Sequence, residues 1–398
     1  MMERRTATAT RPPAVPALAT GSTTILVALT LAHMVNDSFT SLLTPLLPQI
    51  RTGYGVSIAQ TALLVAVSAF VGSVLQPVFG LLADHLDRRL LTAVGPALAG
   101  LGMTLMGVAP SFGVLVLLVA LGGVGSAIFH PASVAYVHQG ARPDQRGLFN
   151  ALFSAGGTAG LAVGPLAATT LGLGRLPWLL PVGLAVGALC YTVTPSTRVA
   201  SRTPRGWRDY STVFRGPIRL LWGMSVLRSL STVSYQALVG FALAARGFDR
   251  HIGPTLAVFG IAAALGGIAG GQISDRVGRV RVLRSSVLVT IPLFVGLVYS
   301  TPASWWYYPL TALVGALVNA NVPVSVVTAQ EYAPDHVATA SAMMMGFAWG
   351  TSGVLFLFVG SLADVTSPRF AMVTSILMLL PALWLTLRLP EPAGHRSA

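Results

Sequence analysis

The chain has 398 residues, of which 9% are charged and 54% are hydrophobic, and its mean hydropathy is +0.72. Ordinary soluble domains carry about 25% charged residues, so this composition excludes a soluble globular protein and indicates a polytopic membrane protein. The net charge of +13 does not indicate nucleic-acid binding, because every basic residue is Arg and most of them fall in alternate loops.

Apolar stretches long enough to cross a bilayer follow one another along the chain. A crossing helix needs roughly 20 apolar residues. We predict an all-α protein with about twelve transmembrane helices, near residues 23–47, 58–83, 90–109, 112–139, 147–173, 176–195, 217–245, 253–274, 282–300, 304–331, 338–363 and 370–388.

The distribution of Arg predicts the topology. Nineteen of the 25 Arg residues lie in one set of alternate loops and termini, and five lie in the other set. The positive-inside rule therefore predicts an inner-membrane protein with both termini in the cytoplasm. We predict a disordered tail over 1–20, six-helix bundles over 21–195 and 217–390, a cytoplasmic linker over 196–216 and a second tail over 391–398.

Two charges stand deep inside apolar segments, Asp37 near the start of the first half and Arg228 near the start of the second. They are 191 residues apart, and the same offset separates Gly80-Leu-Leu-Ala-Asp84 from Gly271-Gln-Ile-Ser-Asp275. The chain is therefore predicted to contain two copies of one membrane unit. A charge in hydrocarbon costs roughly 3 kcal/mol on insertion scales, so both charges are candidate functional residues.

The first helix places three polar residues on one face, because His33, Asn36 and Asp37 lie at i, i+3 and i+4. Asp37 in a water-accessible path could exchange protons, assisted by His33 and His130. The alternative is a permanent ion pair between Asp37 and Arg228 that holds the halves together. His130, directly before a proline, is either a proton relay or a partner of a backbone carbonyl.

The seventh helix offers a candidate substrate site. Arg228 and Tyr235 share a helical face, and a guanidinium is a permanent cation suited to bidentate contact with carboxylate or phosphonate. Asn321 occupies the position that corresponds to His130 in the repeat. We predict that Arg228, Asn36, Tyr235, Asn319 and Asn321 contact the substrate.

The repeated loop resembles the signature loop of the major facilitator superfamily, with Asp87 where that motif usually has Gly. The resemblance implies two six-helix bundles around a central site and a gate at the cytoplasmic side. The residues that it assigns to the gate, together with a glutamate that ends the tenth span, are Asp84, Arg88, Arg89, Asp275, Arg276, Arg279 and Glu331. Glu331 is expected to serve either as a gate or as a structural cap.

Further motifs resemble the fosmidomycin-resistance group of that superfamily. They include His33-Met-Val-Asn36-Asp37, the stretch from Gly125 to Pro131, and Gly156-Gly157-Thr-Ala-Gly160. The resemblance implies proton-coupled export of a small toxic compound or antibiotic. The alternatives are proton-coupled uptake of a small anionic metabolite and a membrane receptor or scaffold without transport.

Other classes of protein fit the sequence poorly. No catalytic triad or metal cluster stands out, so we predict neither an enzyme nor a cofactor. The chain contains no Lys, which excludes the usual phosphate-binding loop of ATP-driven pumps, and Cys190 is its one cysteine. The expected partners are a small-molecule substrate, protons and the bilayer, and the expected oligomeric state is a monomer.

Overall fold

The computed structural model describes residues 22–76, 86–140, 145–196 and 213–392. Every regular element in these residues is a helix. The predicted tail over 1–20, most of the predicted linker over 196–216, the end of the predicted C-terminal tail, and Asp84 lie outside the described residues.

The described residues of the first half form six helical segments. They are α1 (Ser22–Thr40) with α2 (Leu43–Tyr54), α3 (Ile58–Ala69) with a π-helical turn (Phe70–Val74), α5 (Arg88–Leu105), α6 (Phe112–Gly140), α7 (Arg146–Leu171), and α8 (Leu180–Val193) after a 3-10 segment (Leu173–Leu179).

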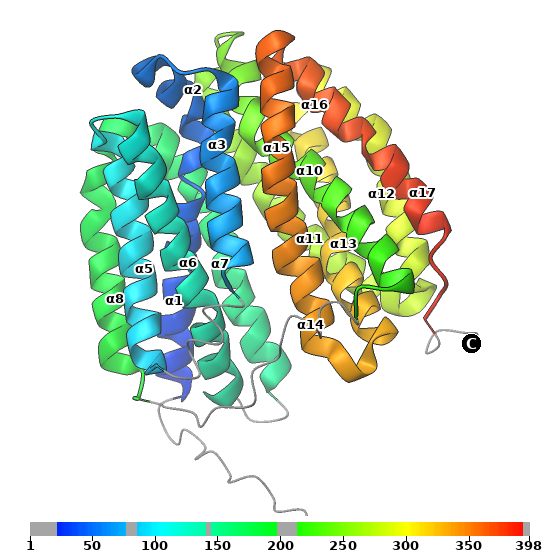
Figure 1. The fold of residues 1–398 in the computed structure, drawn as a ribbon, viewed down its shortest axis with the longest axis horizontal. Coiled ribbons are helices and arrows are strands. Elements are labelled where there is room, and N and C mark those ends of the chain that lie inside the picture. Colours follow the sequence, from blue (N-terminus) through cyan, green and yellow to red (C-terminus); the bar gives the residue numbers. More distant parts are fainter. Residues whose placement is uncertain (1–21, 77–85, 141–144, 197–212, 393–398) are drawn as a thin grey trace, which may run out of the picture.

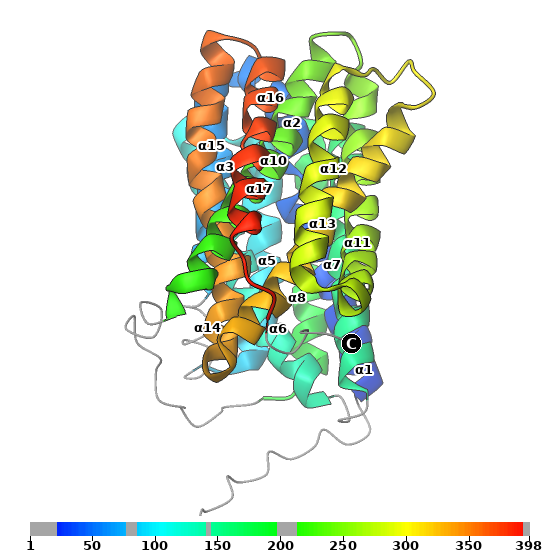
Figure 2. The same cartoon turned by 90° about the vertical axis from the view of Figure 1, so that its right-hand side faces the viewer.

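The second half repeats this arrangement. Its segments are α10 (Gly216–Ala244), α11 (Ile252–Val277), α12 (Arg279–Tyr299), α13 (Tyr307–Tyr332), α14 (Val337–Ala342) joined through a π-helical turn (Met343–Phe347) to α15 (Ala348–Val365), and α16 (Pro368–Leu377) with α17 (Leu379–Leu387). Figure 1 shows the two six-helix bundles side by side, and Figure 2 shows the second bundle facing the viewer.

The predicted all-helical membrane fold is confirmed. Ten helical stretches of the described chain are long and apolar enough to cross a membrane, and Ile58–Val74 forms a shorter apolar helix. The 29-residue α10 supplies the remaining segment, because 29 residues span about 43 Å at 1.5 Å per residue. The described chain is therefore approximately consistent with the twelve predicted spans.

The first span extends beyond its predicted end at residue 47. The helix breaks between α1 and α2 and then continues to Tyr54. Pro45, three residues into α2, lacks the N–H that would continue the helical hydrogen-bond ladder across the break. Gly55, with φ of 64°, ends α2 in the left-handed region that favours glycine.

In the part of the chain that the structure describes, three helix pairs make the most extensive contacts between the halves. These are α3 with α15, α7 with α11, and α2 with α10. Small residues permit the close approach, since a methyl group added at Gly360 of α15 would lie 2.4 Å from the Cβ atom of Ala62 of α3. Figure 1 shows α3 and α15 adjacent to each other between the bundles.

A carboxylate joins the halves at the end of the molecule where α3 begins and α15 finishes. The Asp364 carboxylate accepts hydrogen bonds from the backbone N–H groups of Ile58 (2.8 Å) and Ala59 (2.7 Å). These N–H groups belong to the first turn of α3 and have no acceptor within their own helix. We call this end the latch end. The other end, which carries Arg88, Arg89 and Arg279, is the arginine-rich end.

Candidate functional site

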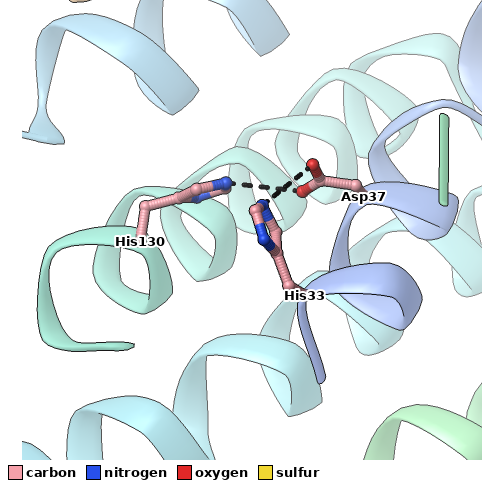
Figure 3. Close-up of side chains that lie close together, drawn as sticks. All are labelled: His33, Asp37 and His130. Atoms are coloured by element: carbon pink, nitrogen blue, oxygen red, sulfur yellow. Dashed lines mark ion pairs between the residues drawn. The ribbon is translucent and has the colours of Figure 1, made fainter. Parts of the chain in front are cut away.

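The Asp37 carboxylate lies between two imidazole rings in the first half. Its Oδ2 atom is 3.2 Å from Nε2 of His33, and its Oδ1 atom is 3.4 Å from Nε2 of His130. Figure 3 shows the two rings approaching the carboxylate from α1 and from α6. The structure thus brings together all three residues that the sequence assigned to proton coupling.

The other nitrogen of each ring identifies its tautomer. Nδ1 of His33 lies 2.8 Å from the carbonyl oxygen of Phe153, and Nδ1 of His130 lies 2.8 Å from the carbonyl oxygen of Ser126. A carbonyl oxygen only accepts hydrogen bonds, so both Nδ1 atoms carry hydrogen. His130 therefore contacts a backbone carbonyl and Asp37 at once.

The tautomers of the two rings determine how many protons the cluster needs to form its hydrogen bonds. A neutral imidazole carries one N–H, so each neutral ring would direct the lone pair of Nε2 towards a carboxylate oxygen. In each of these contacts the Nε2 atom and the carboxylate oxygen are both acceptors, so they repel each other. Each contact becomes a hydrogen bond only when a proton lies between its two atoms, so the assembled cluster holds up to two exchangeable protons.

Neighbouring groups fix the positions of the three side chains. Asn36 donates from Nδ2 to Oδ1 of Asp37 (3.0 Å) and to the hydroxyl of Ser126 (3.2 Å). The ring of Phe153 stacks on His33 with a centroid separation of 4.2 Å. These contacts come from α1, α6 and α7, so the cluster joins three helices of the first half.

Gly157 allows α7 to pack directly against the cluster. A methyl group at this position would lie 2.4 Å from Nε2 of His33 and 2.9 Å from Oδ2 of Asp37. Both distances are shorter than van der Waals contact. The absence of a side chain therefore leaves the space that the imidazole and the carboxylate occupy.

The same cluster has the donor set of a metal site. The ligand atoms of His33, Asp37 and His130 all lie within 4.8 Å of one another. Imidazole and carboxylate ligands suit divalent transition metals, and a metal would occupy the lone pairs that otherwise take protons. The sequence predicted no metal site among these residues.

Arg228 lies in α10 with 2% of its surface exposed. Its Nη2 atom donates to the hydroxyl of Ser229 (2.8 Å), whereas Nε and Nη1 have no hydrogen-bond partner. Within the described residues, no ion pair links Arg228 to Asp37 or to any other carboxylate. The alternative of a permanent Asp37–Arg228 pair is thus not what this structure contains.

The other predicted substrate residues lie in three environments. Asn36 belongs to the Asp37 cluster, and Tyr235 packs between the rings of Phe259 and Phe294 at 5.1 Å from each. Asn319 donates to the carbonyl of Ala263 (2.7 Å), which joins α13 to α11. Asn321 is buried, and its Oδ1 atom accepts a hydrogen bond from Ser286 (3.1 Å).

Arg279 is the centre of a polar network at the arginine-rich end. Its guanidinium pairs with Asp275 and with Glu331 (3.3 Å), and it donates to the Ser274 hydroxyl (2.7 Å). The network joins α11, α12 and α13 within the second half. Arg276, also predicted to gate, has an exposed side chain.

The equivalent region of the first half differs in detail. Asp87 caps α5 by accepting from the backbone N–H of Arg89 (3.0 Å), and it also accepts from the hydroxyl of Ser196 (2.6 Å). The Arg89 guanidinium lies 4.0 Å from the centre of the Tyr191 ring, and Arg88 is buried. The carboxylate that replaces the usual glycine therefore acts as a helix cap.

The sequence did not indicate several contacting residues, among them Ser126, Phe153, Ser286 and Asp364. The first three are ordinary constituents of apolar helices, and only their three-dimensional neighbours distinguish them. Asp364 carried a signal, because it is an acidic residue at the end of a predicted span.

Comparisons with known proteins identify the family of this chain. The family model of the Major Facilitator Superfamily matches residues 29–356. The chain is similar to the fosmidomycin resistance protein of Escherichia coli, with 28% identity over 92% of this chain and 93% of that protein. It is also similar to the uncharacterized MFS-type transporter YfnC of Bacillus subtilis, with 28% identity over 85% of this chain and 86% of that protein.

Solved structures share the fold. A bacterial homolog of the human lysosomal transporter Spinster, in an inward-facing and occupied conformation, superposes with a TM-score of 0.74 and 17% identity over 92% of this chain and 96% of that chain. The nucleoside transporter NupG gives a TM-score of 0.76 with 11% identity over 91% and 99% of the two chains. At these identities the likeness concerns the fold alone.

Proposed function

This chain belongs to the Major Facilitator Superfamily and is a multi-pass membrane transporter, not an enzyme, and we propose that it exports a small toxic compound or antibiotic in exchange for protons. The observation that carries the proposal is the Asp37 carboxylate held between the two Nε2 atoms of His33 and His130. Export as the direction is supported by similarity to a fosmidomycin resistance protein.

Proton binding at this cluster is coupled to helix packing. With protons in both contacts, hydrogen bonds hold α1 and α6 together beside α7. When the protons leave, lone pairs of His33 and His130 face the carboxylate, and the three groups repel one another. Proton release therefore favours a rearrangement of these helices, which alternating access requires.

The described surroundings of the cluster contribute no charge, so proton binding involves only the side chains of Asp37, His33 and His130. The neighbours from the described parts of α1, α6 and α7 include Asn36, Ser126, Phe129, Phe153 and Gly157, all of which are uncharged. The charged residues of α5 are confined to its first turn, and α8 carries none. Protonation of the cluster is thus set by its own members and by access to water.

The Arg279 network bears on gating, and the distribution of Arg residues bears on the orientation in the membrane. The Arg279 network at the arginine-rich end would stabilise one state of the second bundle. The excess of Arg in one set of loops supports cytoplasmic termini and insertion in the inner membrane. The proposed substrate path runs between the two bundles.

The test is substrate-dependent proton flux in liposomes that contain the purified protein and a pH-sensitive dye. Fosmidomycin and other small organic anions form the substrate panel. Asp37→Asn should abolish the flux, whereas Asp249→Asn, which removes an exposed carboxylate outside the cluster, should preserve it. Proton movement that persists unchanged in Asp37→Asn would contradict the proposed coupling.

Energised whole cells decide the direction of transport. An exporter lowers the cell-associated substrate relative to cells that carry Asp37→Asn. A rise in cell-associated substrate would instead establish proton-coupled uptake, and no substrate movement under either condition would favour a receptor or scaffold.

A further inference from the structure

Three side chains that can bind a metal converge inside the first half (Figure 3). The ligand atoms of His33, Asp37 and His130 all lie within 4.8 Å of one another. The Nε2 atoms of the two rings are 3.2 Å and 3.4 Å from the carboxylate oxygens that they face. Around a tetrahedral ion with bonds of about 2.0–2.1 Å, neighbouring ligand atoms are about 3.3 Å apart. Both contacts therefore have the spacing of two ligands on one ion.

The far nitrogen of each ring is held as in a metal-binding histidine. Nδ1 of His33 donates to the carbonyl oxygen of Phe153, and Nδ1 of His130 donates to the carbonyl oxygen of Ser126, both at 2.8 Å. Histidines that bind a metal almost always donate their other N–H to a carbonyl, a carboxylate or water. This second contact fixes the tautomer and the plane of the ring. Both rings thus direct a free Nε2 lone pair at the carboxylate, which is the form that a metal requires.

The carboxylate is also held in place, and the cluster is accessible. Asn36 donates from Nδ2 to Oδ1 of Asp37 at 3.0 Å, so the carboxylate has a hydrogen-bonded partner of its own. The side chain of His130 is 25% exposed, which gives an ion an approach to the cluster. Three protein ligands leave one position of a tetrahedral ion for water.

A metal ion and protons would compete for the same lone pairs. Each Nε2 atom needs its own proton to form a hydrogen bond with the carboxylate, whereas one divalent ion satisfies both rings and the carboxylate together. Imidazole ligands favour transition metals such as Zn²⁺. Mg²⁺ and Ca²⁺ prefer sites made of oxygen ligands.

We propose that His33, Asp37 and His130 form a binding site for a divalent transition metal ion such as Zn²⁺, which takes the place of the protons. The bound ion joins α1 to α6 and holds these helices in the arrangement that the structure describes. The site is a further binding activity of this chain. It rests on the proposed function only for the expectation that bound metal inhibits proton-coupled transport.

Metal binding is measured on purified, tag-free protein in detergent, without a substrate or a proton gradient. Co²⁺ is the first probe, because its visible absorption reports the coordination geometry. We expect one Co²⁺ ion per chain, which Zn²⁺ displaces and Mg²⁺ does not. Zn²⁺ should also raise the unfolding temperature, because a ligand that binds only the folded state stabilises it.

Three variants each remove one ligand, namely His33→Gln, His130→Gln and Asp37→Asn. Each should weaken Co²⁺ binding by about 100-fold or more, since loss of an outer-shell partner alone costs about 10–100-fold. His251→Gln is the matched control, because that imidazole lies outside the cluster and contacts the Tyr308 hydroxyl at 2.8 Å. It should bind Co²⁺ as wild type does.

X-ray absorption of the wild-type protein loaded with Zn²⁺ identifies the ligands without any variant, and it should show two imidazoles. A spectrum without imidazole ligands would overturn the metal site. So would the absence of saturable Co²⁺ binding at micromolar concentrations, or equal affinities in wild type and the three ligand variants.

These measurements separate the metal site from the proposed function. Proton flux that depends on Asp37, in a protein that binds no metal, would retain the proposed function and remove the metal site. Metal binding without substrate-dependent proton flux would retain the site and remove the proton coupling. Where both are observed, Zn²⁺ should inhibit proton flux in liposomes and Mg²⁺ should not. Flux that is unchanged with Zn²⁺ bound would show that the metal does not take the place of the protons.

Discussion

The carboxylate of Asp364 caps a helix that belongs to the other half of the molecule. It accepts from the backbone N–H of Ile58 at 2.8 Å and from the next N–H at 2.7 Å. A negative charge at a helix N-terminus also interacts favourably with the helix dipole. This contact therefore stabilises the conformation in which the bundles meet at the latch end.

Removal of this cap should weaken the closed latch end. Asp364→Ala is expected to destabilise the protein by about 1 kcal/mol, the usual effect of losing an N-cap, and to lower its unfolding temperature in detergent. Asp249→Ala removes an exposed carboxylate elsewhere and should leave that temperature unchanged. Equal unfolding temperatures for Asp364→Ala and wild type would show that the cap does not hold the halves together.

The two imidazole contacts of Asp37 predict the number of protons moved. Wild type should exchange up to two protons for each substrate molecule, and His33→Gln and His130→Gln should each exchange one fewer. Stoichiometry can be measured in liposomes from the pH gradient that just stops substrate flux. A wild-type ratio of one that neither glutamine variant changes would mean that only one contact carries a proton.

The sequence predicts the fold because long apolar spans and a 191-residue repeat are visible without a structure. It also places His33, Asn36 and Asp37 on one helical face, since their spacing follows the helical period. It does not predict which of the distant charges meet. Asp37 contacts His130 rather than Arg228, because helix rotation and the close packing at Gly157 decide the partner, and neither is a local property of the chain.

The sequence also gives a misleading indication of the roles of Asp87 and Asp364. Asp87 occupies a glycine position of the loop motif, yet it caps α5. Asp364, at the end of an apolar segment, resembles the many acidic residues that only mark a membrane boundary. Its role depends on α3, which is more than 300 residues away in the chain and lies beside it only in the folded molecule.

Because the Arg228 guanidinium has no carboxylate partner among the described residues, its replacement should stabilise the protein and abolish substrate binding. Arg228→Met replaces a buried charge with an apolar side chain of comparable length and should stabilise the protein by up to about 3 kcal/mol, while transport of anions is lost. The measurement is thermal unfolding of the purified variant beside an uptake assay. Arg89→Met, which removes a guanidinium that rests on Tyr191, is the control and should not raise the unfolding temperature.

A fall in the unfolding temperature of Arg228→Met would show that the charge already has a compensating partner in the protein without ligand. That result would argue against the predicted contact of Arg228 with an anionic substrate, even if transport were lost.

A methyl group added at Gly157 should disturb the Asp37 cluster directly. In Gly157→Ala the added carbon would lie 2.4 Å from Nε2 of His33, so α7 must move away or the imidazole must leave Asp37. Overpacking of this kind costs about 1–3 kcal/mol, and proton-coupled transport should fall sharply. Gly296→Ala is the matched control, because a methyl group there meets nothing within 4 Å, and that variant should transport normally. Full proton-coupled transport by Gly157→Ala would show that transport does not depend on the close packing of α7 against His33 and Asp37.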